Sequence, residues 1–242
     1  MAEEIKSKAL QRLVKDLRAA HGGNLASITL YGSTAQDEND DASRHDVLVV
    51  LRSTTPEDLR PALEPVRAWT RAGNPMPIYF STDELQRAGD VFPIEFLQME
   101  QARKIVYGAD PFEFVTISDA NLRHQTEYEL RTKFLRLRRL FLLSANSAEQ
   151  LKKLMSDSLS SFVALFRAVL LLRGQAPARF KRDVIAETAR LLAFDASPFL
   201  EILKLREGTG PRLSDTATDD LFTAYLAQLA RVIDAVDQMP GD

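Results

Sequence analysis

The fold of this chain is decided by two stretches of sequence, Leu30-Tyr31-Gly32-Ser33-Thr34-Ala35 and Arg44-His45-Asp46-Val47-Leu48-Val49-Val50. The first stretch ends an apolar run, residues 27–31, which predicts a short buried strand that stops at a Gly-Ser turn. The second stretch contains the run of residues 47–51, whose β-branched and leucine side chains are typical of a strand covered on both faces. Polar and acidic residues 37–41 lie between the two strands and predict a loop.

The rest of the first half alternates predicted helices with predicted strands. A helix over residues 4–20 ends at Gly22-Gly23, and a second helix over residues 56–71 begins with Thr55 as its N-cap. Three further short strands are predicted over residues 77–80, 93–96 and 104–107.

The second half shows helical periodicity and no strand pattern. Apolar residues recur at steps of three and four, as in Leu130, Phe134, Leu137 and Phe141, and this pattern predicts a bundle of about five helices. The sequence therefore predicts an α+β protein. Residues 1–112 would form a mixed sheet with helices, and residues 113–242 would form an all-helical bundle.

The composition is that of an ordinary globular protein, with 242 residues of which 45% are hydrophobic and 27% are charged. Because the chain has no cysteine, disulfide bonds, thiolate metal ligands and cysteine nucleophiles are all excluded. The formal net charge of −3 argues against a net-basic nucleic-acid-binding protein, although a local basic stripe remains open.

The longest apolar stretch, residues 159–172, is shorter than the roughly 20 apolar residues of a membrane-spanning helix and contains Arg167. We therefore expect a buried bundle helix and no membrane association. The charged residues at the N-terminus do not form a signal peptide, and the lack of cysteine agrees with a reducing compartment. The expected location is the cytoplasm.

The Gly-Ser turn and the strand that follows it resemble the nucleotidyltransferase superfamily, especially its minimal prokaryotic and kanamycin-type members. In that family a strand ends in Gly-Ser, a short helix follows, and an Asp-x-Asp pair opens the next strand. Here Gly32-Ser33 takes the first position and Arg44-His45-Asp46 takes the second. The family's third carboxylate lies on a later strand, where Glu95 is the natural candidate. The resemblance covers roughly residues 1–110.

The resemblance implies a nucleotide site with ATP or another nucleoside triphosphate as ligand or substrate. It assigns Asp46 and Glu95 as catalytic residues and Mg²⁺ ligands, and it assigns Gly32, Ser33 and Arg44 to nucleotide binding. The chemistry suits these residue types, because divalent metals held by carboxylates neutralise phosphate charge and orient an in-line attack. Backbone N–H groups at the start of a helix receive phosphates.

The sequence departs from the family at Arg44, which stands where the first aspartate of the pair is expected. Alternate residues of a strand share a face, so the Arg44 guanidinium would pair with Asp46 and repel a divalent ion. His45 would point to the opposite face and pack there. Asp40 or Asp41 in the acidic loop is an alternative source of the lost oxygen ligand.

Two functions therefore stay open. The first is a pseudoenzyme, a protein of this fold with weak or lost catalysis that binds a nucleotide or a partner. The second is an active metal-dependent nucleotidyltransferase that moves a nucleoside monophosphate to a hydroxyl of a small molecule, a tRNA or a protein. A homodimer is allowed by either function.

Purely structural interpretations compete with each assignment. Gly32-Ser33 is also a plausible strand-to-helix turn with Ser33 as the N-cap, and Asp46 and Glu95 are also plausible as ordinary strand-end or surface carboxylates. Five cations lie within nine residues of one predicted helix: Arg131, Lys133, Arg136, Arg138 and Arg139. They predict a solvated face, with an anion-binding wall as the alternative.

Overall fold

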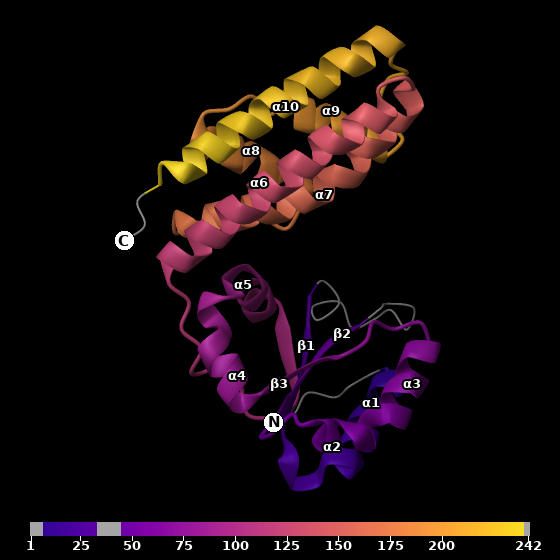
Figure 1. The fold of residues 1–242 in the computed structure, drawn as a ribbon, viewed down its shortest axis with the longest axis vertical. Helices are drawn as coiled ribbons and strands as arrows, with labels where there is room; N and C mark the ends of the chain where they lie inside the picture. Colours follow the sequence, from indigo (N-terminus) through magenta and orange to yellow (C-terminus); the bar gives the residue numbers. More distant parts are fainter. Residues whose placement is uncertain (1–6, 33–44, 240–242) are drawn as a thin grey trace. The chain divides into compact units, whose positions relative to one another are not determined.

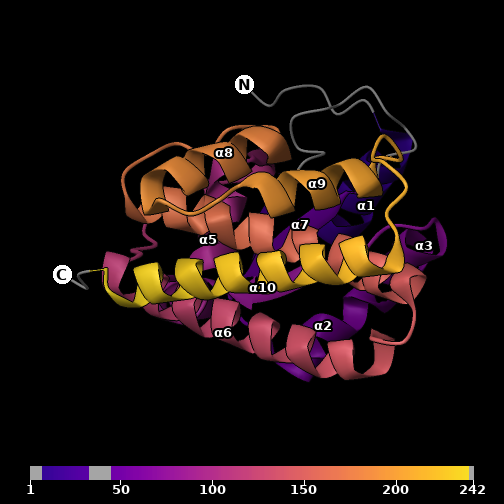
Figure 2. The ribbon, with the colours of Figure 1, turned by 90° about the horizontal axis from the view of Figure 1, so that it is seen from above.

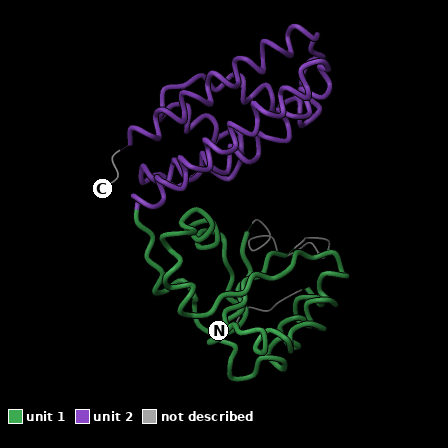
Figure 3. Tube along the Cα trace, viewed as in Figure 1, with its two compact units in different colours: residues 1–118 green, residues 119–242 purple. Residues whose placement is uncertain are grey.

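The computed structural model describes residues 7–32 and 45–239 of the chain. The chain divides into two compact units, residues 1–118 and residues 119–242, which are coloured separately in Figure 3. Among the described residues, the first unit holds all the strands and the second is helical (Figure 1). The predicted α+β class, a mixed sheet with helices followed by a helical bundle, is confirmed.

The sheet of the first unit has strand order β3-β2-β1-β4. Its strands are β1 (Leu25–Tyr31), β2 (Asp46–Leu51), β3 (Ile78–Ser81) and β4 (Arg103–Gly108). β1 runs antiparallel to both β2 and β4, whereas β2 and β3 are parallel. The carboxyl end of β1 therefore meets the amino ends of its neighbours, and Tyr31 pairs with Asp46 on one side and Arg103 on the other. Polar residues from three strands thus gather at one edge of the sheet.

One face of the sheet packs against α1 (Lys8–His21), α2 (Pro56–Leu59) and α3 (Leu63–Arg71). Ile28, Val49 and Trp69 are buried together in this core. Thr55 caps α2 as predicted, because its hydroxyl accepts the Asp58 N–H. The single helix predicted over residues 56–71 is interrupted by a 3₁₀ turn, Arg60–Ala62. The interruption has a physical reason, since Pro61 within that turn has no backbone N–H to donate.

The other face of the sheet is covered by α4 (Thr82–Arg87) and α5 (Pro93–Gln101). The strand predicted over residues 93–96 is wrong, because these residues begin α5. Pro93 occupies the first helical turn, where a missing N–H costs nothing, and the following residues to Gln101 are good helix formers. Phe96 and Met99 of α5 are buried in the same core as Leu48 and Val50 of the sheet.

The second unit is a bundle, seen from another side in Figure 2. Its described part contains five helices, as predicted: α6 (Asp119–Ser144), α7 (Ala148–Leu172), α8 (Lys181–Leu192), α9 (Ser197–Arg206) and α10 (Asp215–Asp237). α7 packs against the other four helices, and its Leu159, Phe162 and Phe166 are fully buried. By length and composition α7 is apolar enough to cross a membrane, yet half of that apolar stretch is buried inside the protein. Such burial is typical of a core helix.

Candidate functional site

Gly32 lies directly after β1, at a place where a side chain would meet the carboxylate of Asp46. Its φ is +84°, a backbone conformation that residues with a side chain adopt only with strain. Its N–H donates to the carbonyl of Ala102 at 2.9 Å. A Cβ atom on this residue would lie 3.3 Å from Oδ2 of Asp46. Glycine therefore leaves room beside the Asp46 carboxylate, and any side chain would crowd it.

Tyr31 lies opposite Asp46 in the strand pairing, and both are half-buried. Burial, and next the negative charge of Asp46, raise the pKa of the Tyr31 phenol to about 12. The phenol therefore keeps its proton at neutral pH and remains a hydrogen-bond donor.

His45 is buried on the face of the sheet that α1, α2 and α3 cover, where it stacks on Trp69 with ring centroids 6.3 Å apart. Its backbone N–H donates to Oδ1 of Asn74. The indole N–H of Trp69 donates in turn to the carbonyl of Pro75 at 2.8 Å. The prediction that His45 packs, on the face opposite Asp46, is confirmed.

Arg103 is a residue at this edge that the sequence analysis missed. Its Nη2 donates to Oδ2 of Asp110 at 2.7 Å, its Nη1 donates to the carbonyl of Glu100, and its guanidinium lies over the Phe112 ring. These contacts tie the start of β4 to the turn that follows the strand. The sequence signal was faint, because the sequence offers both Glu100 and Asp110 as partners for this arginine and does not show that it lies beside Tyr31.

Glu95 lies in the first turn of α5, where its neighbours Ile94 and Phe96 are buried and Glu95 itself is exposed. The expectation that it follows Asp46 on a strand of the sheet is therefore wrong. Its assigned catalytic role remains a prediction.

Ser33, Arg44 and the acidic loop fall outside the described residues, so the predictions that rest on them stay as they were made. Within residues 7–32 and 45–239, no group of three or more histidine, aspartate or glutamate side chains is placed to hold a metal ion. Asp46 offers one carboxylate at the sheet edge. The described residues alone do not fit a complete Mg²⁺ site.

Two of the five cations in the basic row on α6, Arg131 and Lys133, are paired with carboxylates one helical turn away. Arg131 Nε lies 2.8 Å from Oε1 of Glu127, and Arg131 Nη2 lies 3.5 Å from Oδ2 of Asp237. Lys133 Nζ lies 2.8 Å from Oε2 of Glu129. This pairing agrees with the solvated-face interpretation for this part of the row.

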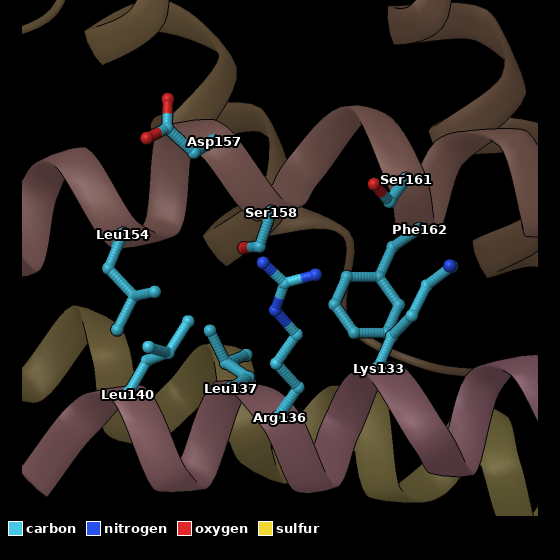
Figure 4. A pocket seen from close by; sticks show the side chains of 9 residues that line it. All are labelled: Lys133, Arg136, Leu137, Leu140, Leu154, Asp157, Ser158, Ser161 and Phe162. Carbon is cyan, nitrogen blue, oxygen red and sulfur yellow. The ribbon is translucent and has the colours of Figure 1, made fainter.

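A cavity of about 220 Å³ lies between α6 and α7, and Figure 4 shows the side chains that line it. Its lining consists of Lys133, Arg136, Leu137, Leu140, Leu154, Asp157, Ser158, Ser161 and Phe162. Arg136 reaches from α6 toward Ser158 on α7. The Ser158 hydroxyl is already engaged, because it lies 2.9 Å from the Met155 carbonyl and 3.1 Å from the hydroxyl of Tyr225. Lys133 and Arg136 of the basic row therefore line a small cavity whose other walls include three leucine side chains.

No protein-family model matches the chain, and no curated protein matches it in sequence. Among solved structures, the spectinomycin adenyltransferase AAD(9) from Enterococcus faecialis, determined with ATP and spectinomycin, matches with a TM-score of 0.57. The match covers 96% of this chain and 99% of that chain at 12% sequence identity. The chain has a nucleotidyltransferase fold. At this identity the likeness establishes the fold alone, and the fold extends over both the sheet unit and the helical bundle.

Proposed function

We propose that this protein binds a nucleotide at the sheet edge formed by Gly32 and Asp46, with weak or lost nucleotidyl transfer. The observation that carries the proposal is the glycine backbone at the end of β1, which is open beside the Asp46 carboxylate. The nucleotidyltransferase fold supports it, and so does the ATP in the adenyltransferase neighbour. The Gly32 N–H already donates to the Ala102 carbonyl, so the main-chain donors to a phosphate would come from the residues that follow Gly32.

The chain's own residues suggest how a nucleotide is held. Ser33 follows Gly32 and adds a hydroxyl donor, while the always-protonated Arg44 supplies positive charge to phosphate oxygens. The same arginine stands where the family has an aspartate, and Glu95 lies on a helix rather than on a strand beside Asp46. Both features favour binding over metal-dependent turnover.

The alternative is an active enzyme that transfers a nucleoside monophosphate from a nucleoside triphosphate to a hydroxyl. The retained Asp46 at the start of β2 favours it, because a strand-end carboxylate is a suitable Mg²⁺ ligand. Asp40 or Asp41 would then supply the oxygen that Arg44 does not. The acceptor in this case is a small molecule, a tRNA or a protein, and the adenyltransferase neighbour was determined with spectinomycin.

Calorimetric titration with ATP, with and without Mg²⁺, tests the choice. For the unmodified chain we expect binding that depends little on Mg²⁺, and no transfer of label from α-labelled ATP. Arg44→Asp restores a carboxylate pair and is expected to make ATP affinity depend on Mg²⁺. Strong Mg²⁺-dependent turnover by the unmodified chain, lost in Asp46→Ala, would establish the active enzyme instead.

A matched pair of glycine variants tests where the nucleotide binds. Gly32→Ala places a methyl group against Asp46, whereas Gly73→Ala carries the same positive-φ strain at a position with open space around it. Both variants are expected to lose a similar amount of stability, about 1 kcal/mol. Only Gly32→Ala is expected to weaken ATP binding in the calorimeter. Equal ATP affinity in the two variants would show that Gly32 is merely a structural turn.

A further inference from the structure

Two cations from different helices meet on one neutral oxygen in the helical unit. Nζ of Lys181, at the start of α8, donates to Oγ of Ser160 on α7 at 3.0 Å. Nη1 of Arg206, at the end of α9, donates to the same Oγ and to the carbonyl of Ser156. α8 and α9 pack against each other and against α7 (Figure 2), which brings these distant residues together.

Arg167 adds a third positive charge to this group. Its guanidinium donates to the backbone carbonyls of Ala178 and Arg179, just before α8 begins. We call Arg167, Lys181 and Arg206 the Ser160 cluster. Within the part of the chain that the structure describes, none of the three makes an ion pair with a carboxylate; their hydrogen-bond acceptors are carbonyl and hydroxyl oxygens.

The charges of the cluster lie close enough to act on one another. Burial, and after it the charges of Arg206 and Arg167, lower the pKa of Lys181, and Glu207 opposes this only in part. Burial also lowers the pKa of Arg167, against the influence of Glu187. A neutral donor would join the helices at Ser160 without this repulsion, so helix packing alone does not account for the two cations on that hydroxyl.

An open hollow of about 650 Å³ adjoins the cluster. Its lining consists of Arg179, Phe180, Lys181, Arg182, Asp183, Leu203 and Glu207. The Phe180 side chain is 67% exposed and stands directly beside Lys181. The lining holds three cations against two carboxylates, and Arg206 shares the Ser160 hydroxyl with Lys181 beside it. An anionic group beside an exposed aromatic ring is the chemistry that such a surface accommodates.

We propose that this hollow binds a nucleoside phosphate, with the phosphate on Lys181 and Arg206 and the base stacked on Phe180. The ligand is either a free nucleotide or the 5′-phosphorylated end of an RNA strand, which present the same groups. The net charge of −3 and the limited size of the hollow favour one phosphate-bearing unit over a long nucleic-acid track. This second site lies within the helical unit and does not depend on the sheet edge at Gly32.

The test places a fluorescent reporter inside the hollow. In Phe180→Trp, base stacking on the new indole is expected to quench its emission, and the unmodified chain with its natural Trp69 gives the baseline. The full-length variant is titrated with AMP and, separately, with a 5′-phosphorylated adenosine tetranucleotide. Quenching by AMP identifies a free nucleotide as ligand, and quenching by the tetranucleotide alone identifies a strand end. Inorganic pyrophosphate is expected to reverse the quenching.

Charge variants in the Phe180→Trp background separate binding from helix packing. Lys181→Gln with Arg206→Gln is expected to weaken quenching at least about tenfold, because two charge-assisted hydrogen bonds to phosphate are lost. Arg139→Gln removes an exposed cation of α6 and is expected to change nothing. Thermal unfolding checks that each variant is folded, and Lys181→Gln alone replaces the double variant if that one unfolds. Absence of quenching by both probes, undiminished quenching in the folded charge variant, or no competition by pyrophosphate would overturn the proposal.

Discussion

The helical unit contains two groups of cations with opposite surroundings. In the basic row of α6, Arg131 and Lys133 each lie against a glutamate four residues earlier in the same helix. In the Ser160 cluster, Lys181 and Arg206 converge on a hydroxyl. The hydrogen bond that Arg131 donates to Glu127 raises the pKa of Arg131, whereas burial and neighbouring cations lower the pKa of Lys181.

The difference shows that a run of charge in the sequence is a poor guide to a charged site. At Arg131 and Lys133 a glutamate precedes each cation by one helical turn, so this part of the α6 row neutralises itself. The Ser160 cluster draws its members from positions 167, 181 and 206, and only the packing of three helices brings them together. Cations without a carboxylate partner are available to an anion, whereas Arg131 and Lys133 are already paired.

Between the α6 row and the Ser160 cluster, the largest effect of a substitution on the free energy of unfolding is expected at Glu127. Its side chain is 16% exposed and contacts both Arg123 and Arg131, so Glu127→Ala leaves two guanidinium groups without this partner. We expect the free energy of unfolding to fall by about 1 kcal/mol, measured by urea denaturation. Glu129→Ala, which removes a more exposed carboxylate with Lys133 as its partner, is the control and should cost less. An equal loss in both variants would contradict the paired-network account.

The same network is expected to depend on pH. Hydrogen bonding from Arg131 holds the pKa of Glu127 below its ordinary value in the folded protein. Stability from a carboxylate with a lowered pKa is fully present above the unfolded pKa and is lost as the pH falls through the folded value. The difference in unfolding free energy between the unmodified chain and Glu127→Ala should therefore shrink below about pH 4. A difference that stays constant down to pH 3 would argue against a role for ionised Glu127.

The smallest effect is expected at Lys181. Lys181→Met removes a hydrogen bond to Ser160, and it also removes the repulsion from Arg206 and Arg167. Because these two contributions oppose each other, the free energy of unfolding should change by less than about 0.5 kcal/mol in urea denaturation. Since the folded-state pKa of Lys181 is lowered, any gain from the substitution should diminish as the pH rises toward 10. A loss as large as that in Glu127→Ala would mean that the Ser160 cluster serves mainly to join helices.

Most of the fold was predictable from local patterns. The continuous apolar run at residues 47–51 and the Gly-Ser turn at residues 32–33 indicated the two central strands, and steps of three and four indicated the bundle. The segment at residues 93–96 was misassigned because four apolar and acidic residues fit either a strand or a helix start. Only the packing of Phe96 and Met99 on the sheet decides between them.

The part of the candidate site that lies on two paired strands was predictable, because residues close in sequence form it. Gly32 follows Tyr31, whose partner in the strand pairing is Asp46, so this pairing places Gly32 near the Asp46 carboxylate whatever the distant chain does. The position of Glu95 depends on whether residues 93–96 form a strand or a helix. The sequence pattern indicated a strand, whereas the residue lies in α5. Arg103 reaches the same edge only through the register between β1 and β4, which a single sequence does not display.

Trp69 gives the molecule a built-in optical marker. It is the one tryptophan in the sequence, it is 3% exposed, and it stacks on His45, the residue next to Asp46. Its emission therefore follows the melting of the sheet unit, while far-UV circular dichroism is dominated by the long helices of the bundle. Recording both signals during one denaturation separates the cooperativity of the two units without a label. Loss of the His45 stack would also register a local opening of the strand that presents Asp46, before the unit as a whole unfolds.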